Sequence, residues 1–125
     1  MKNLLIVAVG GGLGSIARYL LSGWILHRTL NWQFPLGTFT VNVLGCLCVG
    51  LLGGLVVKLD FLSGEMRLFL FTGIAGGFTT FSAFGLETFY LLRKGELGIA
   101  AAYVVLSVIV GMLVLWAGFS ATHRL

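Results

Sequence analysis

Long apolar segments alternate with short polar ones along the whole chain. Four segments consist mainly of apolar residues, and they cover residues 4–26, 37–57, 68–92 and 97–119. Each is between 21 and 25 residues long, and a helix needs roughly 20 apolar residues to cross a bilayer. The pattern therefore predicts an all-α membrane protein, a single domain over residues 1–125 with four transmembrane helices.

The composition leaves little material for anything besides these helices. Hydrophobic residues make up 58% of the chain, charged residues 10%, and the mean hydropathy is +1.06. The polar residues include no nucleophile paired with a base and no cluster of histidines, so we do not expect an enzyme. The formal net charge is +4, but the basic residues are scattered. Scattered basic residues are typical of the flanks of membrane helices rather than of a nucleic-acid surface, and no nucleic-acid partner is expected.

The third apolar segment contains its own helix breakers. Gly76 and Gly77 each lower helix propensity by roughly 1 kcal/mol, and the β-branched Thr79 and Thr80 follow directly. We therefore expect the third helix to be broken mid-membrane at its glycine pair, where protein or a water-filled cavity must satisfy the backbone. Carbonyl groups freed between Gly76 and Thr79 would then face a cation. An alternative of equal weight is that the glycines only let helices pack closely.

Several side chains near this break are suited to an anion. Phe81 and Phe84 lie three residues apart, so they share a face where the helix resumes, and the positive edge of an aromatic ring can face an anion. In the second segment Thr38 and Asn42 lie four apart and also share a face. The Asn42 amide either donates a hydrogen bond to an anion or bonds across helices as structural glue.

Arg18 stands near the middle of the first segment. A membrane-embedded arginine is a functional candidate by default. The structural alternative is that Arg18 caps carbonyl groups or pairs with Glu87 or with a partner chain. The sequence leaves both interpretations open.

Basic residues flank the two ends of the helices almost equally. Those expected on the side of the termini are Lys2, Lys58, Arg67 and Arg124, and those on the opposite side are Arg28, Arg93 and Lys94. Because orientation in a membrane is set by an excess of basic residues on one side, we expect insertion both ways. Two copies facing opposite ways would form a dual-topology antiparallel homodimer about an axis in the membrane plane. A cation held by both broken helices would fit on that axis.

Three motifs resemble those of a known family. They are G-G-x-G-x-x-x-R-Y at residues 11–19, G-T-x-x-x-N at residues 37–42 and G-x-x-G-G-F-T-T-F-S-x-F at residues 73–84. In this order and spacing they resemble the CrcB/Fluc family of fluoride channels. The length and the number of spans agree over the whole chain, and the third motif is the specific one.

The resemblance implies a dual-topology homodimer with two fluoride pores, embedded in the lipid bilayer. It implies a central structural sodium ion, held by the backbone carbonyl groups of Gly76 and Thr79 from each subunit. The pore residues implied by the resemblance are Asn42, Phe81, Phe84, Ser82, Thr38 and Tyr103. The family usually carries a threonine or serine between Ser82 and Phe84, and this chain has Ala83 instead. One hydroxyl group of the polar track is therefore missing.

From these features we expect a passive channel that exports fluoride across a bacterial inner membrane, as a multi-pass protein. Small donors and ring edges replace the water around a small anion while binding it weakly enough to let it leave. One alternative is a proton-coupled exporter of the small multidrug-resistance type, which needs an acidic residue in the first segment, where this chain has Arg18. The other alternative is a membrane scaffold that transports nothing.

Overall fold

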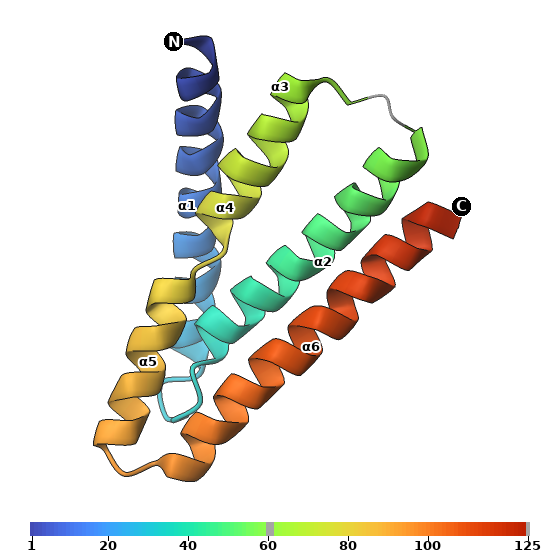
Figure 1. Ribbon diagram of the computed structural model, residues 1–125. Helices are drawn as coiled ribbons and strands as arrows, with labels where there is room; N and C mark the ends of the chain where they lie inside the picture. The colour runs from blue at the N-terminus through green and yellow to red at the C-terminus, as the bar shows by residue number, and fades with distance from the viewer. Residues whose placement is uncertain (60–61, 125) are drawn as a thin grey trace.

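A computed structural model describes residues 1–59 and 62–124, and its regular structure is helical (Figure 1). In chain order the elements are α1 (Lys2–Arg28), α2 (Leu36–Leu59), α3 (Gly64–Arg67), the π-helix η1 (Leu68–Ala75), α4 (Gly76–Phe78), α5 (Phe81–Arg93) and α6 (Leu97–Arg124). The elements α3, η1, α4 and α5 together make the third span. No strand occurs in the described residues.

Within the described residues, four helical segments are long and apolar enough to cross a membrane. They are Lys2–Arg28, Leu36–Lys58, Gly64–Arg93 and Leu97–Arg124. The prediction of an all-α membrane protein with four spans is thus confirmed, and the chain is a multi-pass membrane protein. The helices extend past the predicted segments, and the fourth runs on to Arg124 instead of ending at residue 119.

The spans pack as two close pairs that share a narrow contact region (Figure 1). The first pair joins α1 to η1 and α4, and the second joins α2 to α6 along most of their length. Few large side chains are fully enclosed, and most apolar faces of the helices point outward. Outward apolar faces are what a lipid environment requires, because there the hydrophobic effect does not gather them into a core.

Glycines allow both pairs to approach closely. In the second pair, a Cβ on Gly50 would collide with the carbonyl oxygen of Leu115 on α6. In the first pair, a Cβ on Gly77 would collide with the carbonyl oxygen of Gly11, and Gly73 lies against Gly10 in the same way. The packing role of the glycines, one of the two interpretations that the sequence left open, is therefore present in the structure.

The third span is broken, but not at its glycine pair. Gly76 has helical backbone angles (φ −63°, ψ −38°), and α4 continues through Phe78. The extended residues are Thr79 (φ −83°, ψ 157°) and Thr80 (φ −150°, ψ 115°). The prediction of a break mid-membrane is confirmed, and its placement at Gly76 and Gly77 is wrong. The π-helix η1, which precedes the break, was not predicted.

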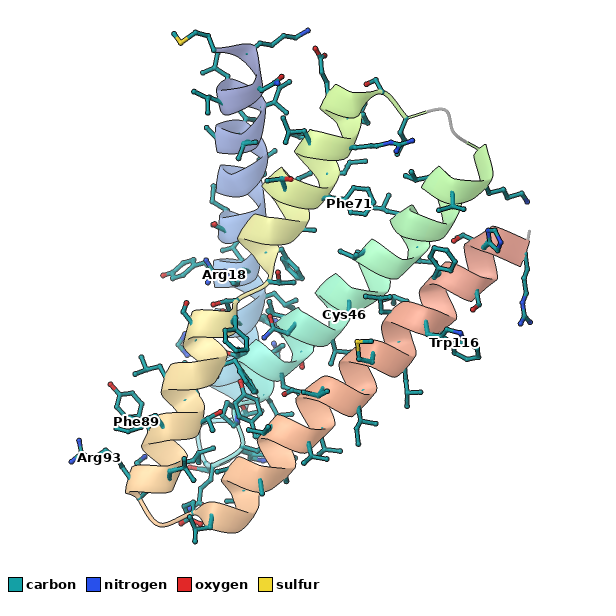
Figure 2. All side chains as sticks on the ribbon, viewed as in Figure 1. Arg18, Cys46, Phe71, Phe89, Arg93 and Trp116 are labelled. Atoms are coloured by element: carbon teal, nitrogen blue, oxygen red, sulfur yellow. The ribbon has the colours of Figure 1, made fainter. Side chains whose placement is uncertain are left out.

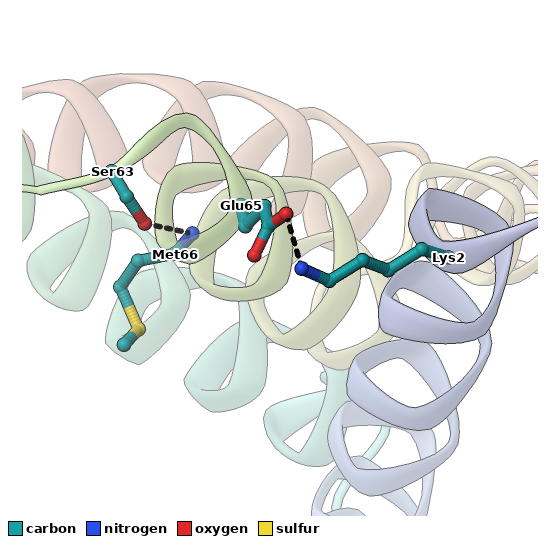
Figure 3. Close-up of polar contacts among 4 residues, drawn as sticks. All are labelled: Lys2, Ser63, Glu65 and Met66. Atoms are coloured by element: carbon teal, nitrogen blue, oxygen red, sulfur yellow. Dashed lines mark hydrogen bonds and ion pairs between the residues drawn. The ribbon is translucent and has the colours of Figure 1, made fainter.

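Polar contacts secure the ends of the spans. Lys2 and Glu65 form an exposed ion pair of 2.6 Å, which joins the start of α1 to the start of the third span (Figure 3). The Ser63 hydroxyl group accepts a hydrogen bond from the Met66 amide and caps α3 (Figure 3). At the opposite end, Gly95 has a positive φ of 80° and turns the chain from α5 into α6.

Candidate functional site

The Asn42 side chain holds the break open from α2. Its Oδ1 accepts a hydrogen bond from the Thr80 amide at 2.8 Å, and its Nδ2 donates one to the Thr80 carbonyl oxygen at 3.1 Å. The carboxamide thus pairs with Thr80 as a neighbouring peptide group would, and it satisfies backbone groups that the break removes from the helix. The nitrogen of a side-chain carboxamide carries two N–H groups, so Asn42 has a second hydrogen-bond donor.

Two backbone amides near the break are diverted away from helical partners. In an unbroken α-helix the Thr80 amide would donate to the Gly76 carbonyl group, and the Ala83 amide to that of Thr79. Here the Thr80 amide donates to Asn42, and the Ala83 amide donates to the Thr80 hydroxyl group at 3.2 Å. The carbonyl groups of Gly76 and Thr79 therefore lose their helical donors, and uncharged backbone oxygens of this kind fit a hard cation such as sodium.

Thr79, in the break, is held by the helix that precedes it and by α2. Its hydroxyl group and its amide both donate to the carbonyl oxygen of Ala75, at 2.9 and 3.0 Å, and they end the helix there. On α2, buried Gly45 lies against the Thr79 methyl group, and a Cβ at position 45 would collide with it. Gly45 therefore helps to place Thr79, and the sequence motifs did not single it out.

The break places two helix ends of opposite polarity next to each other. The last carbonyl groups of α4 carry partial negative charge, and the first amides of α5 carry partial positive charge. The negative end suits a cation, and the positive end, at Phe81 and Ser82, suits an anion. The Ser82 hydroxyl group lies 3.4 Å from that of Thr80 and is exposed.

Three aromatic rings form a continuous row from the break toward the loops. The centroids of Phe81 and Phe84 lie 5.6 Å apart, and those of Phe84 and Tyr103 lie 5.1 Å apart. Phe81 is 83% exposed and Tyr103 is fully buried. The row thus begins at the surface of the protomer and ends inside it.

Glu87 accepts hydrogen bonds from two of the residues that the family resemblance assigned to the pore. The Thr38 hydroxyl group donates to Glu87 Oε1, and the Tyr103 hydroxyl group donates to Glu87 Oε2, both at 2.7 Å. A hydroxyl group has one hydrogen to donate. Neither Thr38 nor Tyr103 therefore offers a free donor in this arrangement.

A cavity of about 610 Å³ runs beside this group, from the loop between α1 and α2 to the break. Arg18 and Glu87 are the basic and acidic residues that line it, and Thr80 and Ala83 line its inner end. Arg18 projects from α1 at the height of the break (Figure 2), and its buried Nε has no hydrogen-bond partner among the described residues. Within residues 1–59 and 62–124 no ion pair joins Arg18 to Glu87, so that pairing is not found.

Comparison with known proteins identifies relatives of this chain. Residues 5–119 match the family described as CrcB-like protein, Camphor Resistance (CrcB). This chain belongs to the CrcB family. It is 58% identical over 119 residues to the "Fluoride-specific ion channel FluC" of Methylobacillus flagellatus, with 95% of this chain and 93% of the relative covered. It is 42% identical over 125 residues to the protein of the same name from Flavobacterium psychrophilum, with both chains covered completely.

This CrcB protein brings most of the predicted site residues into two neighbouring groups. The group at the break contains Gly76, Thr79, Ser82 and Asn42, and the group at Glu87 contains Thr38 and Tyr103. The rings of Phe81 and Phe84 connect the two groups. Their assignment to a pore and to a sodium site stays a prediction.

Sequence reasoning did not include Glu87 among the site residues of this CrcB chain. A signal was present, because Glu87 is the acidic residue within the expected spans and lies three residues after Phe84. That spacing places both on similar faces of one helix. Ala83, whose side chain offers no hydroxyl group, also lines the cavity.

Proposed function

We propose that this protein is a passive fluoride-selective channel that exports fluoride across the inner membrane of a bacterial cell. The observation that carries the proposal is its 58% identity, over 95% of its length, to a protein named fluoride-specific ion channel. At this identity the relative and this chain share most of their side chains. The proposal makes the protein a conductor of ions and not an enzyme.

The chemistry of the break suits a small, strongly hydrated anion. The Ser82 hydroxyl group, the second N–H of Asn42 and the positive helix end of α5 all offer donors without a fixed full charge. The ring edges of Phe81 and Phe84 add weak positive potential. Weak donors in series allow an ion to shed water and still leave, which conduction requires.

Further along the path, the anion competes with the Glu87 carboxyl group for hydrogen-bond donors. The Thr38 and Tyr103 hydroxyl groups donate to Glu87, so fluoride gains these donors only when they turn away from the carboxyl group. The exchange leaves the Glu87 carboxyl group without its two donors, which costs free energy and offsets part of the gain from binding fluoride. It therefore keeps the binding of fluoride from becoming too tight.

A partner copy in the opposite orientation completes the proposed site. Gly76 is exposed, and the Phe81 ring is 83% exposed at mid-span, where a polar break facing lipid would be costly. One protomer supplies only the two carbonyl groups of Gly76 and Thr79, and a second copy related by a two-fold axis doubles that set. An antiparallel homodimer with sodium on its axis accounts for both features. When bound, sodium would satisfy these carbonyl groups and add positive potential near the anion path.

The proposal is tested by fluoride efflux from liposomes that contain the purified protein, followed with a fluoride electrode. We expect rapid efflux of fluoride without a pH gradient and no comparable efflux of chloride. Phe81→Ile should remove most of the flux, because it deletes the ring edge at the break. Phe119→Ile is the matched control, because Phe119 stacks on His123 near the C-terminus, at 5.5 Å between ring centroids.

Other outcomes would favour the alternatives. Efflux that requires a pH gradient would indicate a proton-coupled exporter, and the absence of any ion flux from well-folded protein would indicate a scaffold. Equal flux from Phe81→Ile and the wild type would contradict the assignment of the pore to these rings.

Sodium is tested separately, because backbone carbonyl groups cannot be removed by substitution. Protein purified and assayed in potassium or N-methylglucamine salts should lose fluoride flux and thermal stability, and sodium should restore both. Identical flux and melting temperature with and without sodium would contradict the sodium site and leave the fluoride channel standing.

A further inference from the structure

The loop between α1 and α2 separates two hollows of the protein. The cavity of about 610 Å³ contains the carboxyl group of Glu87 and the hydroxyl group of Thr38 in its wall. A second hollow of about 450 Å³ lies on the other side of the loop, against the first turns of α6. Both hollows are lined by the same three loop residues, Trp32, Gln33 and Phe34. These three residues therefore border both hollows, and we call them the wall.

Phe34 is the member of this wall that contacts the proposed anion path. Its ring meets the Tyr103 ring edge-on, with centroids 5.3 Å apart and an interplanar angle of 80°. Phe84 lies against Tyr103 as well, at 5.1 Å. The phenol of Tyr103 is thus held by Phe34 and Phe84 while its hydroxyl group donates to Glu87.

The loop that carries Phe34 is anchored to its surroundings. The Gln33 side chain donates a hydrogen bond to the Glu96 carboxyl group at 3.2 Å, just before α6 begins. On the other side, the Phe34 ring packs edge-on against Phe39 of α2 at 5.4 Å. The wall therefore has a fixed position between α2 and α6.

We propose that Phe34 is a positioning and sealing residue, which holds Tyr103 against Glu87 and keeps the second hollow separate from the anion path. The inference rests on the proposed fluoride conduction and names the residue that closes a side entrance to the path. Without the ring, water and larger anions would reach Tyr103 and Glu87 from the second hollow. A path with an additional wet entrance discriminates poorly, because an ion there keeps more of its water.

The first test compares fluoride and chloride efflux for substitutions of aromatic residues inside and outside this cluster. Phe34→Leu should lower fluoride flux by about threefold to tenfold, the range expected for loss of an aromatic pair, and should raise chloride efflux. Phe34→Tyr keeps the ring and should restore the wild-type values. Phe89→Leu is the matched control, because Phe89 is exposed on α5, pairs with Tyr90 and lines neither hollow, and it should keep the selectivity of the wild type.

The second test detects the seal directly with a thiol. In a background with Cys46→Ala and Cys48→Ala, Ala102→Cys places a thiol in the second hollow. We expect the anionic reagent 2-sulfonatoethyl methanethiosulfonate to modify this thiol without changing fluoride flux. With Phe34→Ala added, the same modification should reduce the flux by more than half, because the two hollows are then joined.

The outcomes separate this inference from the function on which it rests. Wild-type selectivity in Phe34→Leu, together with no effect of thiol modification in the Phe34→Ala background, would overturn the seal while the channel stands. Absence of fluoride flux from the wild type would overturn the proposed function and this inference with it.

Discussion

Both helix pairs of this protein pack closely through glycines, but only one of them contains a broken span. In the pair of α2 and α6, Gly50 and Gly118 lie against backbone atoms of the opposite helix, and both helices run unbroken. In the pair of α1 with the third span, Gly73 and Gly77 lie against α1 in the same way, and the third span breaks. Close packing by glycine is therefore common to both pairs and does not explain the break.

The difference lies in side-chain hydrogen bonds that compete with the helix. Thr79 and Thr80 bond to neighbouring backbone groups, and Asn42 takes both backbone groups of Thr80. Threonine is known to offer the backbone such alternatives to a helix. The decisive side chain, Asn42, belongs to α2. A residue of the unbroken pair therefore stabilises the break in the third span.

The largest effect is expected for Asn42→Asp. A carboxylate has no N–H for the Thr80 carbonyl group, and an uncompensated acid at mid-membrane costs more than the ~1–3 kcal/mol of a neutral unsatisfied group. We expect fluoride efflux to fall by on the order of 100-fold or more, the equivalent of that cost. Wild-type flux from folded Asn42→Asp protein would show that the pairing with Thr80 does not hold the break open.

The unbroken pair should respond in stability alone. In Gly50→Ala the new methyl group meets the Leu115 carbonyl group, which should cost about 1–3 kcal/mol of overpacking. Thermal denaturation in detergent measures this cost, and the fluoride selectivity of the remaining folded protein should not change. Gly53→Ala is the matched control on α2, because its nearest neighbour is the Phe119 ring at an ordinary 3.5 Å. Equal melting temperatures for both variants would contradict the close contact at Gly50.

A smaller effect is expected for Thr80→Ala, which removes the side-chain cap of α5 but keeps the Thr80 backbone and its pairing with Asn42. Loss of such a cap costs about 1 kcal/mol, so we expect a fewfold decrease of fluoride flux and a modest decrease of melting temperature. Thr88→Ala serves as the control, because the Thr88 hydroxyl group bonds within α5 to the Phe84 carbonyl group. A decrease of flux in Thr88→Ala as large as that in Thr80→Ala would show that the decrease does not depend on the cap.

The smallest effect is expected for Lys2→Met. The pair of Lys2 with Glu65 is mostly exposed, with side chains 73% and 51% accessible, and such pairs contribute about 0–1 kcal/mol. Stability and flux should stay close to those of the wild type. A large loss in this variant would mean that the contact between α1 and the start of the third span governs the break from a distance.

Much of this fold follows from local sequence. The four spans are visible as apolar segments, and Phe81 and Phe84 could be placed on one face from their spacing alone. These features depend on residues near each other in the chain, and periodicity therefore predicts them.

The position of the break could not be predicted in the same way. Glycine propensity pointed to Gly76 and Gly77, but both residues stay helical, and α1 packs against Gly77. The break falls at Thr79 and Thr80, where Asn42 bonds from 38 residues away. A contact between distant segments leaves no local pattern, so propensity alone gave the wrong residues.

The hydrogen-bond partners of Glu87 could not be predicted from the sequence for the same reason. Thr38 and Tyr103 looked like free donors in the sequence, because the spacing within each helix gives no information about the neighbouring helix. Thr38 is 49 residues from Glu87, and only the packed structure brings the two side chains to hydrogen-bonding distance.

The contact of Glu87 with these two hydroxyl groups has a consequence for the turnover of ions. The carboxyl group is tethered to the same polypeptide as the hydroxyl groups, so it cannot diffuse away when an arriving ion takes its place. When the ion departs, the tethered oxygens return to their former partners by rotation about side-chain bonds. In the proposed channel, rotation of these side chains would thereby reset the route after every passage of an ion.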